Sequence, residues 1–142
     1  ELEVAVLRQK DKNLVSVAGE ICMRSKADFY SYQAKYHDKQ AAQLIIPALL
    51  SKTQLDELQE AARLTFISLE CDGLARVDFF LEEDSQQFIL NEINTMPGFT
   101  QISMYPKLWQ CSGIEYSELL NILIEQANWN FKKSNKLTRD YL

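Results

Sequence analysis

Hydrophobic and polar residues alternate over the first seven positions of the chain. This puts three aliphatic side chains on one side of an extended backbone (Leu2, Val4 and Val6), and two glutamates and an alanine on the other (Glu1, Glu3 and Ala5). Side chains of a strand point alternately to opposite faces, so the pattern predicts a half-buried strand. Short apolar runs at 13–17 and 20–23 predict two more strands and favour an antiparallel set. Residues 24–46 follow no clear period, which is typical of a functional or mobile loop.

A helical period follows this stretch. Ser51 and Gln54 have the spacing of a capping box, and Gly73 is placed to end the helix. Between them, side chains that can pack recur at helical spacing: Leu55, Leu58, Ala62, Thr65, Phe66 and Leu69.

The rest of the chain reads as a hairpin followed by two helices. Apolar strands at 74–81 and 87–94 flank the polar run 82–86, and Pro97-Gly98 predicts a turn. A short helix is expected near 106–111 and a final helix over 115–131, capped by Ser112 or Ser117. Its expected apolar side comprises Leu119, Leu120, Leu123 and Ile124. We therefore expect one domain over 1–131 and a polar, fraying tail over 132–142.

Composition narrows the function classes. The 142 residues are 46% hydrophobic and 25% charged, which suits one globular domain. A net charge of −5 with no basic patch argues against a nucleic-acid partner, and no apolar run is long enough to span a membrane. Three scattered cysteines predict reduced thiols in a cytoplasmic protein instead of a zinc site. Because the chain opens directly on a strand without methionine, we expect the N-terminal half of the protein to be absent.

The hairpin carries the candidate chemistry. If its loop is centred on Ser85, Asp78 lies opposite Glu92 and Arg76 lies opposite Asn94, all on one face. The other face then holds Ala75, Val77, Phe79, Ile89, Asn91 and Ile93. Opposed carboxylates repel, and a divalent cation would remove that cost; oxygen ligands of this kind suit Mg²⁺ or Mn²⁺. The alternative is a solvated face on which Arg76 pairs with both carboxylates in a surface network.

Four segments form a distinctive set: residues 29–36 (FYSYQAKY), 73–80 (GLARVDFF), 91–100 (NEINTMPGFT) and 103–106 (SMYP). The last three resemble the signature of the D-alanine–D-alanine ligase family of the ATP-grasp superfamily, and residues 29–36 resemble the mobile loop of that family. The similarity runs in unbroken order to about residue 127. It implies an α+β fold, the ATP-grasp C-terminal domain, with a mostly antiparallel sheet packed with helices.

The resemblance also implies roles for residues of the hairpin and of the segment after it. Asp78, Glu92 and Asn94 would hold two Mg²⁺ ions, and Arg76 would stabilise charge on the transferred phosphate from a hydrated cleft. The backbone N–H of Gly98 would help to form an oxyanion site. The structural alternative is that Gly98 only completes a Pro-Gly turn.

Four further residues would contact substrates, and a fifth would help to enclose them. Ser103 and Met104 would bind the carboxylate of the second D-alanine, although Ser103 could instead cap the short helix. Glu1 would reach the ATP ribose, Lys35 would contact a phosphate, and Tyr36 would help to close the loop; each could equally be an ordinary surface residue.

The implied activity is ATP-dependent ligation of two D-alanines through an acyl phosphate, for peptidoglycan precursor synthesis. The partners would be D-alanine, ATP and the missing N-terminal half, without which this chain would be inactive; a homodimer of the full-length enzyme is also compatible. Three alternatives stay open. They are a D-alanine–D-lactate or D-alanine–D-serine ligase, another ATP-grasp carboxylate–amine ligase, and a non-catalytic module that uses the hairpin as an interaction surface.

Overall fold

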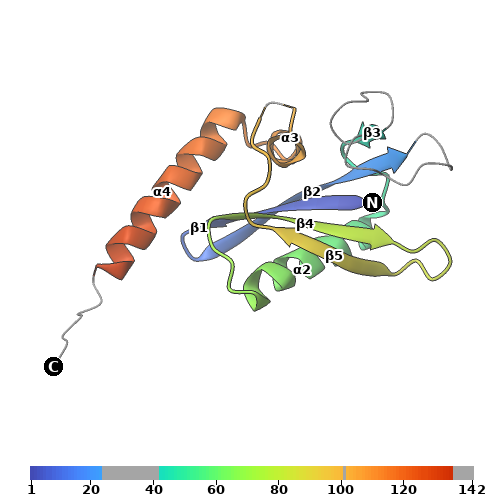
Figure 1. Ribbon diagram of the computed structural model, residues 1–142, viewed down its shortest axis with the longest axis horizontal. Helices are drawn as coiled ribbons and strands as arrows, with labels where there is room; N and C mark the ends of the chain where they lie inside the picture. The colour runs from blue at the N-terminus through green and yellow to red at the C-terminus, as the bar shows by residue number, and fades with distance from the viewer. Residues whose placement is uncertain (24–41, 101, 136–142) are drawn as a thin grey trace.

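The computed structural model describes residues 1–23, 42–100 and 102–135. One five-stranded antiparallel sheet, in the order β3-β2-β1-β4-β5, forms its centre (Figure 1). The strands are β1 (Leu2–Gln9), β2 (Lys12–Met23), β3 (Ala42–Ile45), β4 (Leu74–Leu81) and β5 (Phe88–Asn94). The helices of this part of the chain are α2 (Lys52–Ser68), α3 (Met104–Cys111) and α4 (Tyr116–Ser134). The expected α+β class with an antiparallel sheet is confirmed.

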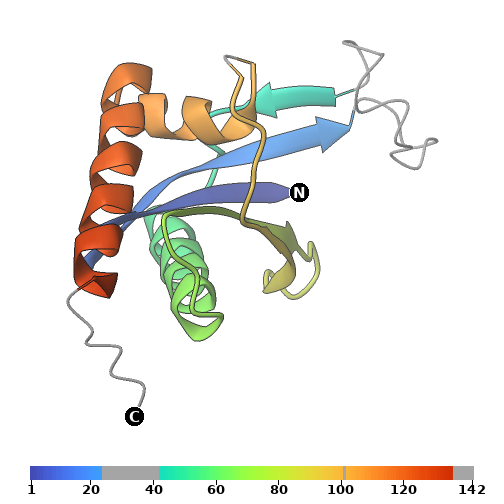
Figure 2. The same ribbon diagram turned by 60° about the vertical axis from the view of Figure 1, so that its left-hand side comes forward.

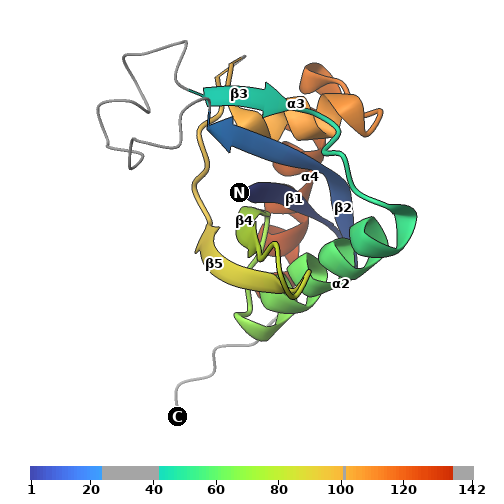
Figure 3. The ribbon, with the colours of Figure 1, turned by 90° about the vertical axis from the view of Figure 1, so that its right-hand side faces the viewer.

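The first strand is buried on both faces, so the expectation of a half-buried strand was wrong. β1 pairs with β2 on one edge and with β4 on the other, which makes it the central strand (Figure 3). The expected division of its side chains between two faces is correct. However, Ala5 is fully buried and Glu3 is only 2% exposed, because helices cover both sides of the sheet.

The second strand is continuous, although two short strands were expected. It runs over twelve residues through a bulge, where Ser16 and Val17 together face Ala5. The Ser16 hydroxyl accepts a hydrogen bond from the Ala5 N–H at 2.9 Å, so the bulge leaves that donor satisfied. β3 was also missed, since its four residues fall in the stretch expected to be irregular.

Helices cover the two faces of the sheet and enclose two apolar clusters (Figure 2). α2 covers one face and packs on the even-numbered residues of β1, which gives a cluster that includes Val4, Val6, Leu58, Phe66 and Val77. α3 and α4 cover the other face, where the cluster includes Ala5, Leu7, Tyr105, Trp109 and Leu119. The polar residues of the hairpin lie on this second face.

The start of α2 agrees with the expected capping box, but its end does not involve Gly73. The Ser51 hydroxyl accepts from the Gln54 N–H, and the Gln54 side chain accepts from the Ser51 N–H. At the other end, Glu70 takes a positive φ of 52° while the N–H groups of Glu70 and Cys71 donate to Ile67 and Phe66. This is a Schellman ending in which a glutamate occupies the left-handed position usually given to glycine.

The last helix buries only part of the apolar side that was expected. Of that side, Leu119 is buried and Leu123 packs against the same cluster, whereas Leu120 and Ile124 are 37% and 60% exposed. Ile122 and Gln126, which were not expected to be covered, are buried. Glu115 is the N-cap residue instead of Ser112 or Ser117, and the helix continues to Ser134. None of the helices in the described ranges is long and apolar enough to cross a membrane.

The capping box gives a first testable prediction. Ser51→Ala should lower the free energy of unfolding by about 1 kcal/mol, because α2 loses the side-chain acceptor for one of its first N–H groups. Ser117→Ala is the matched control, since Ser117 is an exposed serine in the first turn of α4 that does not cap it. Urea unfolding of both variants measures the difference, and equal midpoints would contradict the capping role.

Candidate functional site

The hairpin has the register that its sequence predicted. Asp78 pairs with Glu92 and Arg76 pairs with Asn94 across β4 and β5, so the four polar side chains share one face. That face is also the one of Glu3, because β1 runs antiparallel to β4 with Glu3 opposite Asp78. Polar residues of three neighbouring strands therefore meet on the sheet.

Arg76 is held between two carboxylates. Its Nε donates to Asp78 Oδ1 and a terminal nitrogen donates to Asp78 Oδ2, both at 2.7 Å. Glu3 Oε2 lies 3.1 Å from the same Nε. The side chains are 12% exposed for Arg76, 3% for Glu3 and 1% for Asp78. The expected hydrated cleft around Arg76 was therefore wrong, and the alternative of a solvated surface network does not fit either.

The charges around Arg76 keep it protonated. Burial works to lower the pKa of the guanidinium, but the hydrogen bonds to Asp78 and the negative charges of Glu3, Asp78 and Glu92 outweigh it. The net result is a pKa well above its usual range. Arg76 is thus a permanent positive charge in the middle of an acidic cluster.

Glu3 is the site residue that the sequence reasoning missed. A signal was present, since Glu1 and Glu3 alternate on one side of an apolar strand. Had β1 been placed at the centre of the sheet, a glutamate on its covered face would have required a partner. Among the described residues, oxygens of Glu1, Glu3 and Asp78 lie within 4.8 Å of one another, and Glu92 is not part of that group.

A bulge in β5 ends the agreement between the expected and the observed faces of the hairpin. Asn91 is left unpaired, because Phe79 faces Leu90 where regular pairing would place it opposite Asn91. Ile89 consequently lies opposite Phe80, on the face of Asp78, although it was expected on the apolar face. Both side chains are about half exposed, at 49% for Ile89 and 46% for Phe80. The polar cluster is therefore bordered by an apolar surface on β4 and β5.

The connection between β5 and α3 brings the remaining expected residues to the same side of the sheet. β5 is an edge strand, whereas α3 packs over β1 and β2, so the connection crosses over the face of the sheet (Figure 2). Gly98 lies on it and Ser103 ends it as the N-cap residue of α3. Met104, the first helical residue, is 7% exposed.

Gly98 lies in a close contact and not in a hydrogen-bonded turn. A Cβ at this position would lie 3.0 Å from the Ser103 hydroxyl oxygen. No hydrogen-bonded turn forms at Pro97-Gly98, in contrast to the expectation. Ser103 also does not cap α3 with its side chain; its hydroxyl accepts instead from the Thr100 N–H at 3.1 Å. The two residues thus form one tightly packed corner of the connection.

The other two expected metal ligands, Glu92 and Asn94, lie in more exposed positions than Asp78. Glu92 is exposed and Asn94 is half-buried, with its side-chain oxygen accepting from the Met96 N–H at 3.1 Å. Carboxylate and amide oxygens carry a second lone pair, so Asp78, Glu92 and Asn94 can still offer ligands to a hard cation. Lys35 and Tyr36 lie outside the described residues.

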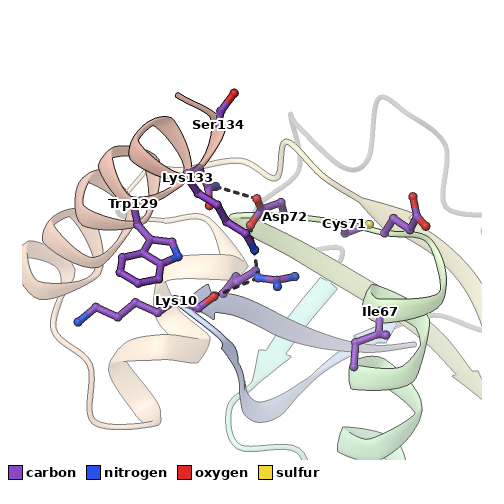
Figure 4. A pocket seen from close by; sticks show the side chains of 10 residues that line it. Lys10, Ile67, Cys71, Asp72, Trp129, Lys133 and Ser134 are labelled. Atoms are coloured by element: carbon purple, nitrogen blue, oxygen red, sulfur yellow. Dashed lines mark hydrogen bonds and ion pairs between the residues drawn. The ribbon is translucent and has the colours of Figure 1, made fainter. Parts of the chain in front are cut away.

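A separate cavity of about 460 Å³ lies at the opposite end of the sheet (Figure 4). It is lined by the β1–β2 turn and the ends of α2 and α4, including Lys10, Cys71 and Trp129. Glu3 and Arg8 are five residues apart on β1, which at roughly 3.3 Å per residue separates the two places by about 16 Å. Of its two acidic residues, Glu70 and Asp72, the latter is bound by Asn130 and Arg8, so this cavity takes no part in the cluster around Arg76.

Known proteins resemble this chain over nearly its whole length. A curated relative, D-alanine–D-alanine ligase A of Bradyrhizobium diazoefficiens, is 45% identical over 142 residues, which cover 99% of this chain and 38% of the relative. The structure of the D-alanine–D-alanine ligase from Coxiella burnetii matches with a TM-score of 0.79 at 36% identity, covering 99% of this chain and 35% of that one.

Two further solved structures are similar to this chain, and one of them contains ATP. VanG D-Ala:D-Ser ligase from Enterococcus faecalis matches with a TM-score of 0.74 at 34% identity, covering 88% of this chain and 35% of that one. D-alanine–D-alanine ligase from Bacillus anthracis, complexed with ATP, matches with a TM-score of 0.70 at 27% identity, covering 94% and 41%. The chain thus spans well under half the length of each of these proteins.

The match to a protein family is consistent with these individual similarities. The family described as D-ala D-ala ligase C-terminus matches residues 1–125. That range contains β1, the hairpin, Arg76 and the corner formed by Gly98 and Ser103. The chain therefore belongs to the D-ala D-ala ligase C-terminus family.

Proposed function

We propose that this chain is the metal-, nucleotide- and second-substrate-binding part of an ATP-dependent ligase that joins two D-alanines. In this reaction the carboxylate of the first D-alanine attacks the γ-phosphate of ATP, and ADP leaves. The amine of the second D-alanine then attacks the acyl carbon, and phosphate leaves as the peptide bond forms. The product would serve peptidoglycan precursor synthesis.

The observation that carries this proposal is the family match over residues 1–125. The ATP-bound relative from Bacillus anthracis supports a nucleotide substrate, since this chain shares its fold at 27% identity. A chemistry based on charge and positioning also suits the site. Phosphoryl transfer asks a protein mainly for alignment and for positive charge near the phosphates.

The residues present fit a divalent metal. Three carboxylates, those of Glu3, Asp78 and Glu92, act on a single guanidinium, and the Glu1 carboxylate lies beside those of Glu3 and Asp78. Such a site would repel phosphates without added positive charge. We propose that Asp78, Glu92 and Asn94 hold Mg²⁺ or Mn²⁺. The metal, when bound, supplies the charge that neutralises the phosphate oxygens.

Arg76 would supply the fixed positive charge of the protein. Two of its N–H groups are already directed at Asp78, which locks the plane of the guanidinium. We propose that its other terminal nitrogen donates to the transferred phosphate and to the oxyanion of the tetrahedral intermediate. The Gly98 N–H would donate to the same oxyanion, where the absence of a side chain lets both the substrate and Ser103 approach.

The remaining roles concern substrate binding. Ser103 and Met104, at the start of α3, would bind the carboxylate of the second D-alanine. Glu1 is half-buried at the start of β1, and its carboxylate would accept hydrogen bonds from the ATP ribose. Lys35 would contact a phosphate and Tyr36 would close the loop over the substrates.

According to this proposal, this chain would not catalyse the reaction without the rest of the enzyme. The site for the first D-alanine and other phosphate-binding groups would come from the rest of the enzyme. The full-length enzyme could also form a homodimer. Because the reaction consumes ATP, we place the enzyme in the cytoplasm.

Phosphate release by the full-length enzyme tests the proposal. Incubation with ATP and Mg²⁺ should release phosphate in proportion to added D-alanine, with the D-alanine dipeptide as product by mass spectrometry. Omitting D-alanine or chelating the metal with EDTA should abolish release. Phosphate release that does not depend on D-alanine would overturn the proposed reaction.

A second candidate is ligation of D-alanine to D-serine. It is supported by the structural match to VanG D-Ala:D-Ser ligase at 34% identity. Competition between D-alanine, D-serine and D-lactate in the same assay separates the candidates, because the mixed products differ in mass. We expect D-alanine to be the preferred second substrate, since the resemblance associates the pair Lys35-Tyr36 with dipeptide-forming enzymes.

A further inference from the structure

We propose that Glu3 is a positioning residue that fixes the orientation of the Arg76 guanidinium. The inference rests on the proposed function, because it deepens the role given there to Arg76. Glu3 belongs neither to the family signature nor to the opposed carboxylates of the hairpin. Glu3 lies on the central strand β1, whereas the signature residues lie on β4, on β5 and after them.

The sheet register explains how Glu3 reaches Arg76. Glu3 lies directly opposite Asp78, and Ala5 lies directly opposite Arg76. Alanine is too small to fill the space above its own strand position, so the long Arg76 side chain can lie along the sheet towards the pair formed by Glu3 and Asp78. Its Nε then comes to 2.7 Å from Asp78 Oδ1 and 3.1 Å from Glu3 Oε2.

Two carboxylates hold the guanidinium better than one would. Asp78 binds the edge formed by Nε and one terminal nitrogen, which fixes the plane of the group. Glu3 attracts the same edge from the neighbouring strand, so that rotation away from Asp78 would separate Arg76 from two charges at once. Glu3 is 3% exposed, so solvent screens this attraction weakly.

The second carboxylate has a specific use at this site. Asp78 is also one of the proposed metal ligands, and an oxygen that serves a cation has less electron density to offer Arg76. Glu3 contacts Arg76 without being among those ligands. It can therefore keep the guanidinium in place whichever other partner Asp78 has.

A purely structural ion pair is the competing explanation. Buried pairs often only satisfy charges and hold neighbouring strands together. In that case, removing Glu3 would lower stability but would slow the reaction by the same factor whether or not Arg76 is present. If Glu3 acts through Arg76, its removal matters only while arginine occupies position 76.

A double-mutant cycle in the full-length enzyme separates the two explanations. Glu3→Gln should lower kcat for dipeptide formation by about 10-fold, since small misplacements of a catalytic group are costly, with a smaller change in KM for ATP. In the Arg76→Lys background, Glu3→Gln should change kcat by less than about 2-fold. Equal effects in both backgrounds, or a normal kcat for Glu3→Gln alone, would overturn the proposal.

Matched variants control for charge and folding. Glu60→Gln removes a glutamate that is 53% exposed and pairs with Arg63 on α2, and it should leave kcat unchanged. If Glu3→Gln does not fold, Glu3→Asp takes its place in the cycle. That variant keeps the charge but withdraws it by one methylene, and the same dependence on Arg76 is expected.

A second readout does not require turnover. Nitrogen-15 NMR of the metal-free full-length protein can follow the Nε–H of Arg76, identified as the signal that Arg76→Lys removes. Its exchange with water should be at least about 3-fold faster in Glu3→Gln than in the wild type, because a loosened hydrogen bond opens more often. Unchanged exchange would overturn the positioning role.

The two readouts also separate this inference from the proposed function. A wild-type enzyme that forms no dipeptide would refute the proposed function, and faster Nε–H exchange in Glu3→Gln would still support the hold of Glu3 on Arg76. An active wild type with unchanged exchange and unchanged kcat in Glu3→Gln would refute only the inference.

Discussion

Arg76→Lys in the full-length enzyme is expected to lower kcat by about 10²-fold or more, while the apparent affinity for ATP changes far less. Lysine keeps the positive charge but replaces a planar fork of donors with a single ammonium group. Such an ammonium cannot bind both oxygens of Asp78 and still direct a further donor at the phosphate. The loss should therefore fall on the transition state, where charge develops, and less on the bound nucleotide.

The stability of this variant should also change. Arg76 is only 12% exposed and makes two 2.7 Å hydrogen bonds to Asp78, so lysine should lower the free energy of unfolding by about 1–2 kcal/mol. Steady-state kinetics of dipeptide formation and a thermal melt measure the two effects. Arg63→Lys, in an exposed pair with Glu60, is the control that should alter neither. A near-normal kcat for Arg76→Lys would mean that Arg76 is only part of the structural charge network.

How much of the site could be predicted depended on the range of the interactions involved. The pairing of Asp78 with Glu92 followed from the hairpin loop, because nearby residues set the register of a two-stranded unit. The prediction failed one residue further on, where the bulge at Asn91 moved Ile89 to the other face. No local pattern marks that bulge, since the residues around it are compatible with regular pairing.

Burial of the first strand could not be predicted from alternation alone. The pattern assigned Glu3 and Ala5 to the same face, which is correct, but it could not say that α3 and α4 would cover part of that face. Coverage depends on helices located about a hundred residues later in the chain. For that reason the pattern predicts an outward-facing Glu3, whereas the residue is 2% exposed.

The helices show the same division between local and distant causes. The capping box could be predicted because the two residues that form it, Ser51 and Gln54, are only three positions apart in the sequence. The buried face of α4 was predicted only in part, since apolar residues occur on more than one of its sides and contacts with α3 and β1 decide which of them is covered. The end of α2 also escaped prediction, because Glu70 adopts a left-handed backbone conformation that favours glycine.

Asp78→Asn should have the second large effect, since it combines a structural and a chemical loss. Asp78 is 1% exposed and binds Arg76 through both oxygens, and an amide in its place would direct one N–H at the N–H groups of arginine. Breaking a buried pair in this way should lower the free energy of unfolding by about 3 kcal/mol, with Glu3 limiting the cost. Loss of a proposed metal ligand should lower kcat by about 10³-fold as well, because the phosphates would then lack both the metal and a correctly held Arg76.

Glu92→Gln tests whether those two losses are separable. Glu92 lies opposite Asp78 on the same face but is exposed, so its replacement should leave the free energy of unfolding within about 0.5 kcal/mol of the wild type. As a proposed metal ligand it should nevertheless lower kcat by about 10²-fold and raise the Mg²⁺ concentration needed for half-maximal rate. Mg²⁺ titrations and urea unfolding of both variants provide the comparison. A Glu92→Gln enzyme with an unaltered Mg²⁺ requirement would remove Glu92 from the proposed metal site.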